Sequence, residues 1–169
     1  MKPQVSACDI PASCEIALSL SGAHFYDCYH TPIESDAPSA LEIYLAIVKK
    51  TPTWMNAMMA LRNRVVSLVG LKNLGHLGEV KDKPASAYRV GDRVGIFSLR
   101  YLSESEIILG DSDKHLNVCV SVCKQTSGKQ HTVALSTVVH IHNTLGRVYM
   151  FFVAPVHKII APAVLAKGM

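Results

Sequence analysis

Polar and apolar residues follow one another along the chain in patterns that predict short helices and strands. Near the start, CEIALSL (14–20) follows Ser13, a residue that caps helices well, and ends before Gly22. The next stretch, FYDCYHTPI (25–33), is rich in aromatic residues and has a proline near its end. These features predict a short helix and then a first strand over 25–33.

The pattern then changes to the spacing of amphipathic helices. Residues 37–50 place apolar side chains three and four positions apart and end in two lysines, which favour a helix C-terminus. Thr51 and Pro52 form a typical helix start, so a second helix is predicted over 52–69. We expect its apolar stripe to be core; the stripe consists of Trp54, Met58, Leu61, Val65 and Leu68.

The second half of the chain has the pattern of a β-meander followed by a helix. A final helix is predicted over 145–166, with Asn143 or Thr144 as its N-cap. Pro155 and Pro162 lie seven residues apart in it, and we expect them to kink the helix or divide it into pieces. The strands of the meander, joined by short polar turns, are predicted over 93–101, 105–111, 115–123 and 131–143.

Two segments have no regular pattern. Residues 71–88 carry three lysines without a clean period, which predicts a long loop that is either a functional lid or mobile. Residues 1–12 are expected to be loosely ordered. The length of 169 residues otherwise suits one domain, 1–169, with a sizeable core.

The order of these elements predicts the fold class. A strand, two helices, a four-stranded meander and a long helix indicate an α+β fold with an antiparallel sheet and helices on one face. This is the order of the helix-grip fold, in which a curved antiparallel sheet wraps a long C-terminal helix. A helix-grip fold leaves a cavity between the sheet and that helix.

Composition limits the kinds of binding partner and the cellular compartment that we expect. The formal net charge is +4, but the 17 lysines and arginines are scattered and form no basic stretch with interleaved aromatics. Nucleic acid is therefore not an expected partner. The five cysteines are odd in number and lack CxxC spacing, and the first fifteen residues lack the apolar core of a secretory signal. We expect reduced thiols and a cytoplasmic location.

An apolar run over 148–166 raises the question of a membrane. It carries His157 and Lys158 at its middle and two prolines, and charges at the centre of a spanning helix cost several kcal/mol. We expect no transmembrane segment here, but a buried or groove-capping helix. Peripheral contact with a membrane is the alternative.

The sequence also suggests a metal-binding alternative. If the last two strands pair with residue numbers summing to 255, Val120 opposes Leu135, and the apolar residues of both strands share one face. The other face then carries a carboxylate and imidazoles suited to zinc or iron: Asp113, His115, His140 and His142. The interpretation we favour is a hydrogen-bonded polar patch, with the contact surface of a homodimer as a further alternative.

Four blocks of the sequence resemble a bacterial family of unknown function, DUF 2867. The blocks are TPTWMNAMMALRNRVVSLVGLKNLG, YRVGDRVGIFSL, LGDSDKHLNVCVSV and STVVHIHNTLGRVYMFFVAPVHKIIAPAVL. The resemblance covers roughly residues 20–166 and implies a START-like, helix-grip (SRPBCC-like) layout. Related domains follow NAD(P)-binding reductase-like domains, but this sequence has no GxGxxG motif. The resemblance therefore implies no cofactor and no established activity.

The superfamily implies a cavity under the C-terminal helix for an apolar or amphipathic small molecule. Thr137 and Tyr149 are the polar groups expected to orient such a ligand. The expected lining is Trp54, Met58, Leu61, Phe97, Leu99, Val118, Val120, Leu135, Thr137, Val139, Tyr149, Phe152 and Val156. A solidly packed core without a cavity is the alternative interpretation.

Three function classes follow. A small-molecule binding module is favoured over an interaction subunit, either a homodimer or a partner of a separate reductase. An enzyme such as a cyclase, an isomerase or a metal-dependent catalyst in the same cavity ranks third. The sequence lacks the GxSxG, HExxH and GxxxxGKS motifs that would favour an enzyme.

Overall fold

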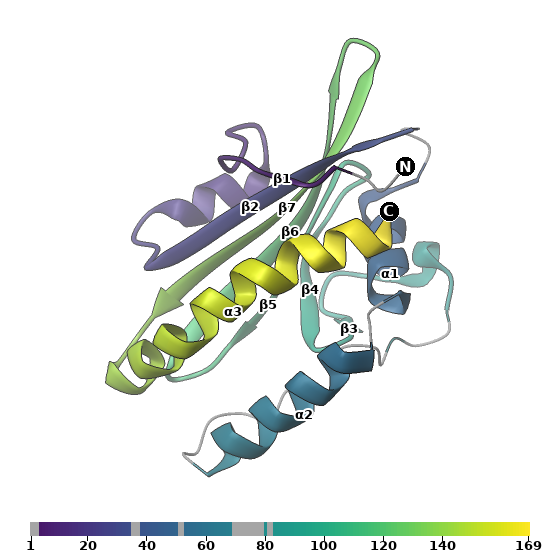
Figure 1. Ribbon diagram of the computed structural model, residues 1–169. Coiled ribbons are helices and arrows are strands. Elements are labelled where there is room, and N and C mark those ends of the chain that lie inside the picture. The colour runs from purple at the N-terminus through teal and green to yellow at the C-terminus, as the bar shows by residue number, and fades with distance from the viewer. Residues whose placement is uncertain (1–3, 35–37, 51–52, 69–79, 81–82) are drawn as a thin grey trace.

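The computed structural model describes residues 4–34, 38–50, 53–68, 80 and 83–169. An antiparallel sheet of seven strands, in the order β1-β2-β7-β6-β5-β4-β3, forms its centre (Figure 1). The strands are β1 (Ser6–Ala7), β2 (Phe25–Ile33), β3 (Arg93–Val94), β4 (Phe97–Leu102), β5 (Glu106–Ser112), β6 (Leu116–Ser127) and β7 (Gln130–Ile141). This confirms the predicted α+β class, and β2 has the bounds that the aromatic pattern predicted.

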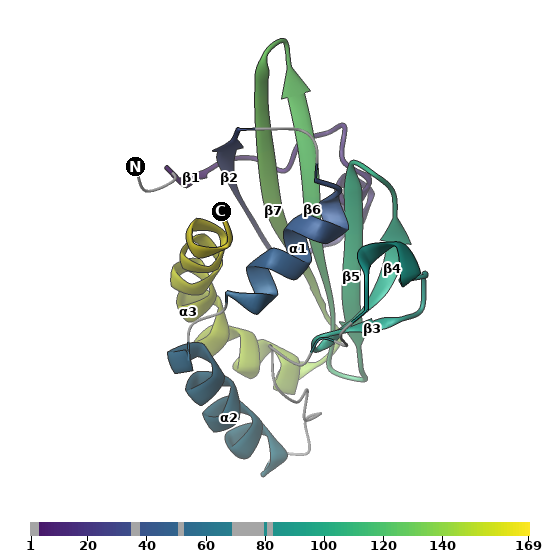
Figure 2. The same ribbon diagram turned by 90° about the vertical axis from the view of Figure 1, so that its right-hand side faces the viewer.

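Three α-helices accompany the sheet in the described part of the chain: α1 (Ala40–Lys49), α2 (Thr53–Ser67) and α3 (Thr144–Gly168). Two short 3-10 helices, η1 (Glu15–Leu20) and η2 (Ala85–Ala87), complete the elements. We call the face of the sheet that α1 and α3 cover the front face, and the opposite one the back face (Figure 2). α2 lies beside the first half of α3, away from the sheet.

The front face carries the main core. Seven residues of α1 are buried there, and they pack against the leucines, isoleucines and valines that alternate along β4 to β7. α1 begins with a capping box: the Ser39 hydroxyl accepts from the Glu42 amide, and the Glu42 carboxylate accepts from the Ser39 amide. Ala161 and Leu165 bring the second half of α3 onto the same core.

The back face is covered by the N-terminal segment. β1 pairs with β2, and Ile10, Cys14 and Ile16 are buried against the back of the sheet. Of the residues 1–12 that were expected to be loosely ordered, 4–12 contain β1 and the buried Ile10, and 1–3 lie outside the described chain. The pattern concealed this cover because an antiparallel sheet with a moderately polar second face usually leaves that face to solvent.

The expectation of reduced thiols also needs correction. Cys14 and Cys123 form a disulfide that joins the N-terminal segment to β6. The other cysteines, Cys8, Cys28 and Cys119, are free. The two bonded residues are 109 apart in sequence, so no short-range spacing motif could have indicated the pair.

The predicted register between β6 and β7 is wrong by two residues. Val120 pairs with Thr137 rather than Leu135, so paired residue numbers sum to 257. The hairpin is tighter than expected because Gly128, with a positive φ of 62°, allows the chain to reverse within two residues. The shift is even, so the predicted faces of both strands are retained.

α3 begins as predicted, with Asn143 as its N-cap: the side-chain oxygen accepts from the Gly146 amide. The predicted division of this helix at Pro155 and Pro162 is wrong, because the helix is continuous over Thr144–Gly168. Figure 2 shows that it changes direction along its length. By length and composition alone, α3 is the one described helix that could cross a membrane.

The expected core stripe of α2 needs correction too. Trp54, Leu61 and Leu68 are exposed, Leu61 to 64% and Leu68 to 84%. The side chain of Val65 lies outside the described residues, as does most of the long loop predicted over 71–88. α2 bonds to α3 through Arg62 and Tyr149, while Trp54, Leu61 and Leu68 leave much of its apolar surface exposed in the described chain.

Candidate functional site

The strand residues of the predicted cavity belong to the packed front core. Leu99, Val120 and Leu135 are buried in one cluster with α1 and the end of α3. Thr137 and Val139 are buried on the same side of β7, while Phe97 and Val118 are partly buried. These side chains therefore contact other core residues, as the solid-core alternative expects.

The helix residues of the predicted cavity do not join them. Trp54, Leu61, Phe152 and Val156 are exposed, Phe152 to 66%. Met58 and Tyr149 are partly buried, and the Tyr149 hydroxyl accepts a hydrogen bond of 3.0 Å from Nε of Arg62. The structure does not bring these six together with the strand residues, because the stripes of α2 and α3 that carry most of them face away from the sheet.

The four predicted metal ligands are not brought together. His140 pairs with Asn117 instead of His115, and its Nε2 lies 3.1 Å from the carbonyl oxygen of Ser21. His142 follows the end of β7 and is exposed. Asp113 makes a turn by accepting from the His115 and Leu116 amides. These bonds are those of a hydrogen-bonded polar patch.

A different cluster has ligand atoms within reach of one another. Cys14, Glu106 and Cys123 form the one such group of three within the described ranges, and all are buried. The two sulfurs are bonded to each other, and the Glu106 carboxylate accepts from the amides of Glu15 and Ile16 and from the Ser121 hydroxyl. The cluster therefore fixes η1 to the sheet and leaves no sulfur free for a metal.

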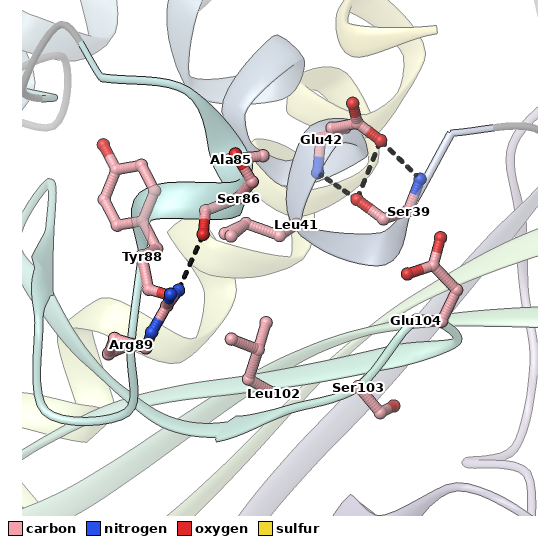
Figure 3. A pocket seen from close by; sticks show the side chains of 10 residues that line it. All are labelled: Ser39, Leu41, Glu42, Ala85, Ser86, Tyr88, Arg89, Leu102, Ser103 and Glu104. Carbon is pink, nitrogen blue, oxygen red and sulfur yellow. Dashed lines mark hydrogen bonds between the residues drawn. The ribbon is translucent and has the colours of Figure 1, made fainter.

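A solvent-open cleft of about 410 Å³ lies between the start of α1, η2 and the turn from β4 to β5 (Figure 3). We call it the α1–η2 cleft. Leu41 and Leu102 lie along its middle, with Arg89 on one side and Glu104 on the other. The Ala40 amide donates to the Glu104 carbonyl at 3.0 Å, which holds two of the walls together.

Two charged groups of the α1–η2 cleft, Glu42 and Arg89, already make hydrogen bonds within the protein. The Ser39 amide and hydroxyl lower the pKa of Glu42, so this carboxylate is ionised and occupied by the capping box. Arg89 Nη1 donates to the carbonyls of Ser86, at 2.6 Å, and Tyr88, at 2.8 Å. Those bonds fix the guanidinium at the edge of the cleft.

A second polar site lies where α3 crosses β2. His157 Nδ1 is 2.9 Å from Asp27 Oδ2, and the Phe25 ring meets the imidazole edge-on. The Asp27 side chain is only 9% exposed, and its Oδ1 is buried without a hydrogen-bond partner. A carboxylate that orients a histidine in this way leaves Nε2 as a possible proton acceptor.

Sequence reasoning missed both sites. The capping box around Ser39 was readable from SALE, but the other walls of the cleft meet only through the fold. Asp27 lies on an aromatic-rich strand, and His157 lies with Lys158 in an otherwise apolar helix. The sequence could have indicated this pair if the ionisable residues of the helix had been compared with those of the strand that it covers.

The comparisons with known proteins give one family. The family model described as "Protein of unknown function (DUF2867)" matches residues 19–164, which is most of the chain. Neither the curated proteins nor the solved structures provide a match.

Proposed function

The chain belongs to the DUF2867 family, and from this premise we propose that it is a small-molecule binding module whose amphipathic ligand occupies the α1–η2 cleft. The observation that carries the proposal is the cleft itself, with about 410 Å³ of space and an apolar middle between opposite charges. That volume is in the range of small-molecule sites in proteins. The position of α3 across the sheet supports a helix-grip interpretation, with the site moved to the edge of the front core.

The lining supports a particular ligand chemistry. Leu41 and Leu102 offer apolar contact at the middle of the cleft, and Ser86 adds a hydroxyl group, whereas the Ser103 hydroxyl is bonded to the Glu106 backbone. Arg89 is fixed by two carbonyls and suits a carboxylate or another anionic group. Glu104, exposed on the opposite side, suits a donor group of the same molecule. The proposed ligand is small, with an apolar body and polar groups at both ends.

Ligand-observed NMR with a panel of small amphipathic carboxylates tests this proposal. We expect Arg89→Ala to weaken binding of any hit about tenfold or more, since a charge-assisted hydrogen bond is lost. Leu102→Trp should abolish binding by filling the cleft. Arg93→Ala is the matched control, because Arg93 is exposed and donates to the Ile96 carbonyl outside the cleft. Hits that bind both cleft variants with the same affinity as they bind the wild type would contradict the proposal.

The pair of Asp27 and His157 favours a second candidate, an enzyme that uses His157 Nε2 as a general base. Asp27 would hold the proton on Nδ1 and so leave Nε2 free to accept one. Histidine ¹⁵N NMR tests this arrangement. A neutral His157 ring protonated on Nδ1 supports it, and a ring protonated on Nε2 would exclude that role.

A further inference from the structure

The outer side of α3 is an apolar stripe with no cover in the described chain. Its large side chains recur at the spacing of one helix face, and several are mostly exposed: Phe151 to 76%, Phe152 to 66% and Ile159 to 68%. Val148 and Val156 complete the stripe. The opposite side of α3 carries Met150, His157, Ala161 and Leu165, which face the rest of the protein.

α2 carries a matching stripe. Trp54 and Leu61 lie seven residues apart, which is close to two helical turns, Leu68 follows at the same interval directly after the end of α2, and all three are exposed. Such side chains are usually buried in a helix that belongs to the core. An exposed stripe on each of two neighbouring helices therefore needs an explanation beyond the packing of this domain.

The two stripes lie on the same side of the helix pair. α2 and α3 run in opposite directions in both views and meet where Arg62 bonds to Tyr149. Leu61 of the α2 stripe precedes Arg62 by one residue, and Val148 of the α3 stripe precedes Tyr149 by one residue. Successive residues of an α-helix are rotated by about 100°, so each stripe lies about 100° around its helix from the contact. In an antiparallel pair of helices, two stripes that precede the contact by the same rotation face the same side of the pair. We call the combined surface the α2–α3 face.

Charge indicates what covers this face. Neither α2 nor α3 contains an aspartate or glutamate, whereas the exposed Arg64, Arg147 and Lys158 are distributed along them. A second copy of the chain would bring the same cations without carboxylates on these helices to pair with them. An anionic bilayer complements both the charge and the apolar stripes, and Trp54 is a residue type typical of membrane interfaces.

We propose that the α2–α3 face docks on the surface of an anionic lipid bilayer, with both helices lying in the membrane plane. The inner side of α3 is held by the protein, because His157 bonds to Asp27 and Leu165 is fully buried. A spanning orientation would separate those contacts. This proposal is independent of the α1–η2 cleft and its ligand.

The test is vesicle binding by the full chain, with phosphatidylcholine vesicles compared with phosphatidylcholine–phosphatidylserine mixtures. Trp54 is the only tryptophan, so its fluorescence reports on this face alone. We expect a blue shift and co-sedimentation with the anionic vesicles, both weakened by salt. Arg147→Ala and Lys158→Ala should each lower the partition coefficient about fivefold.

Apolar contact is tested by Phe151→Ser combined with Phe152→Ser, which should lower the partition more than about tenfold. Leu18→Ser is the matched control, because Leu18 is 75% exposed on η1, beyond the back face of the sheet. Circular dichroism checks that the variants fold. Equal binding to neutral and anionic vesicles, no loss in the double variant, or a protein dimer that shifts the Trp54 emission without lipid would overturn the proposal.

Discussion

Glu106 is a buried carboxylate that holds the N-terminal segment onto the back of the sheet. It is 4% exposed and accepts from two backbone amides at the start of η1 and from the Ser121 hydroxyl. A buried carboxylate is tolerated where such donors replace its water, and the negative charge also favours the N-terminus of a short helix. This one side chain therefore connects β5, β6 and η1.

Replacing Glu106 by alanine should lower the free energy of unfolding by about 3 kcal/mol, because three donors lose their acceptor in a buried site. Urea unfolding followed by circular dichroism measures the change. Glu104→Ala, on the adjacent exposed turn, should stay within about 0.5 kcal/mol of the wild type. Equal losses in the two variants would show that the contacts of Glu106 do not stabilise the fold.

The buried Cys28 thiol should make the free energy of unfolding depend on pH in the alkaline range. Burial raises the pKa of its thiol from 9.0 to about 12. The unfolded chain loses this proton from about pH 9, while the folded chain keeps it to higher pH, so stability should fall between pH 9 and pH 12. Below pH 9 the thiol is protonated in both states and contributes no slope. Burial of Tyr44 raises the pKa of its phenol and adds to the fall at higher pH.

Unfolding of wild type and Cys28→Ala by urea across this range is the measurement. The variant should show a shallower alkaline decline than the wild type. A decline of the same steepness in both proteins would exclude Cys28 as its cause.

At the scale of elements, the sheet supplies a partner at the point where Pro162 interrupts the hydrogen bonding of α3. Proline has no amide hydrogen, so the carbonyl four residues earlier, that of Lys158, loses its helical donor. The Tyr29 hydroxyl on β2 donates to this carbonyl at 3.4 Å. A proline that sequence rules expect to divide the helix thus becomes a point of attachment to the sheet.

A double-mutant cycle tests this attachment. Tyr29→Phe should cost about 0.5 kcal/mol in the wild-type background, where the exposed Lys158 carbonyl exchanges its protein donor for water. In a Pro162→Ala background the same change should cost much less, since the alanine amide supplies the helical bond. Thermal unfolding of the four proteins measures the coupling. The same cost in both backgrounds would argue against the attachment.

Elements that are defined by interactions between residues close in sequence could be predicted, and features that depend on contacts between distant residues could not. The bounds of β2 and the N-cap of α3 depend on neighbours in sequence; the pattern predicted the bounds correctly and narrowed the cap to Asn143 or Thr144, of which Asn143 is the cap. The register of β6 on β7 depended on a two-residue turn at Gly128, which the longer predicted turn missed. Trp54 was expected to be core because apolar stripes usually are, and Phe152 was expected to line a cavity; only the arrangement of α2 and α3 shows both exposed.

At the scale of the whole molecule, the Cys14–Cys123 disulfide joins the layer on the back face to the sheet. It closes a loop across 109 residues of sequence, which strongly restricts the unfolded chain. The α1–η2 cleft likewise depends on the whole fold, because its walls come from three separate regions of the chain. Local sequence signals could predict neither feature.

Removing the disulfide by Cys14→Ser with Cys123→Ser should lower the free energy of unfolding by about 4–5 kcal/mol in the chain-entropy model. Chemical unfolding without reductant measures this loss. Thiol titration of the denatured wild-type protein supplies a direct check, with three free thiols expected, those of Cys8, Cys28 and Cys119. A count of five would contradict the disulfide.

The most direct test of the central claim is native mass spectrometry of untagged protein purified without chelators, in three forms. The wild type is compared with Leu102→Trp, which fills the α1–η2 cleft, and with Val153→Trp on α3 away from it. The account predicts one added organic mass on the wild type and on Val153→Trp that is absent from Leu102→Trp. The same mass on all three, or loss only from Val153→Trp, would place the ligand elsewhere and contradict the assignment of the cleft.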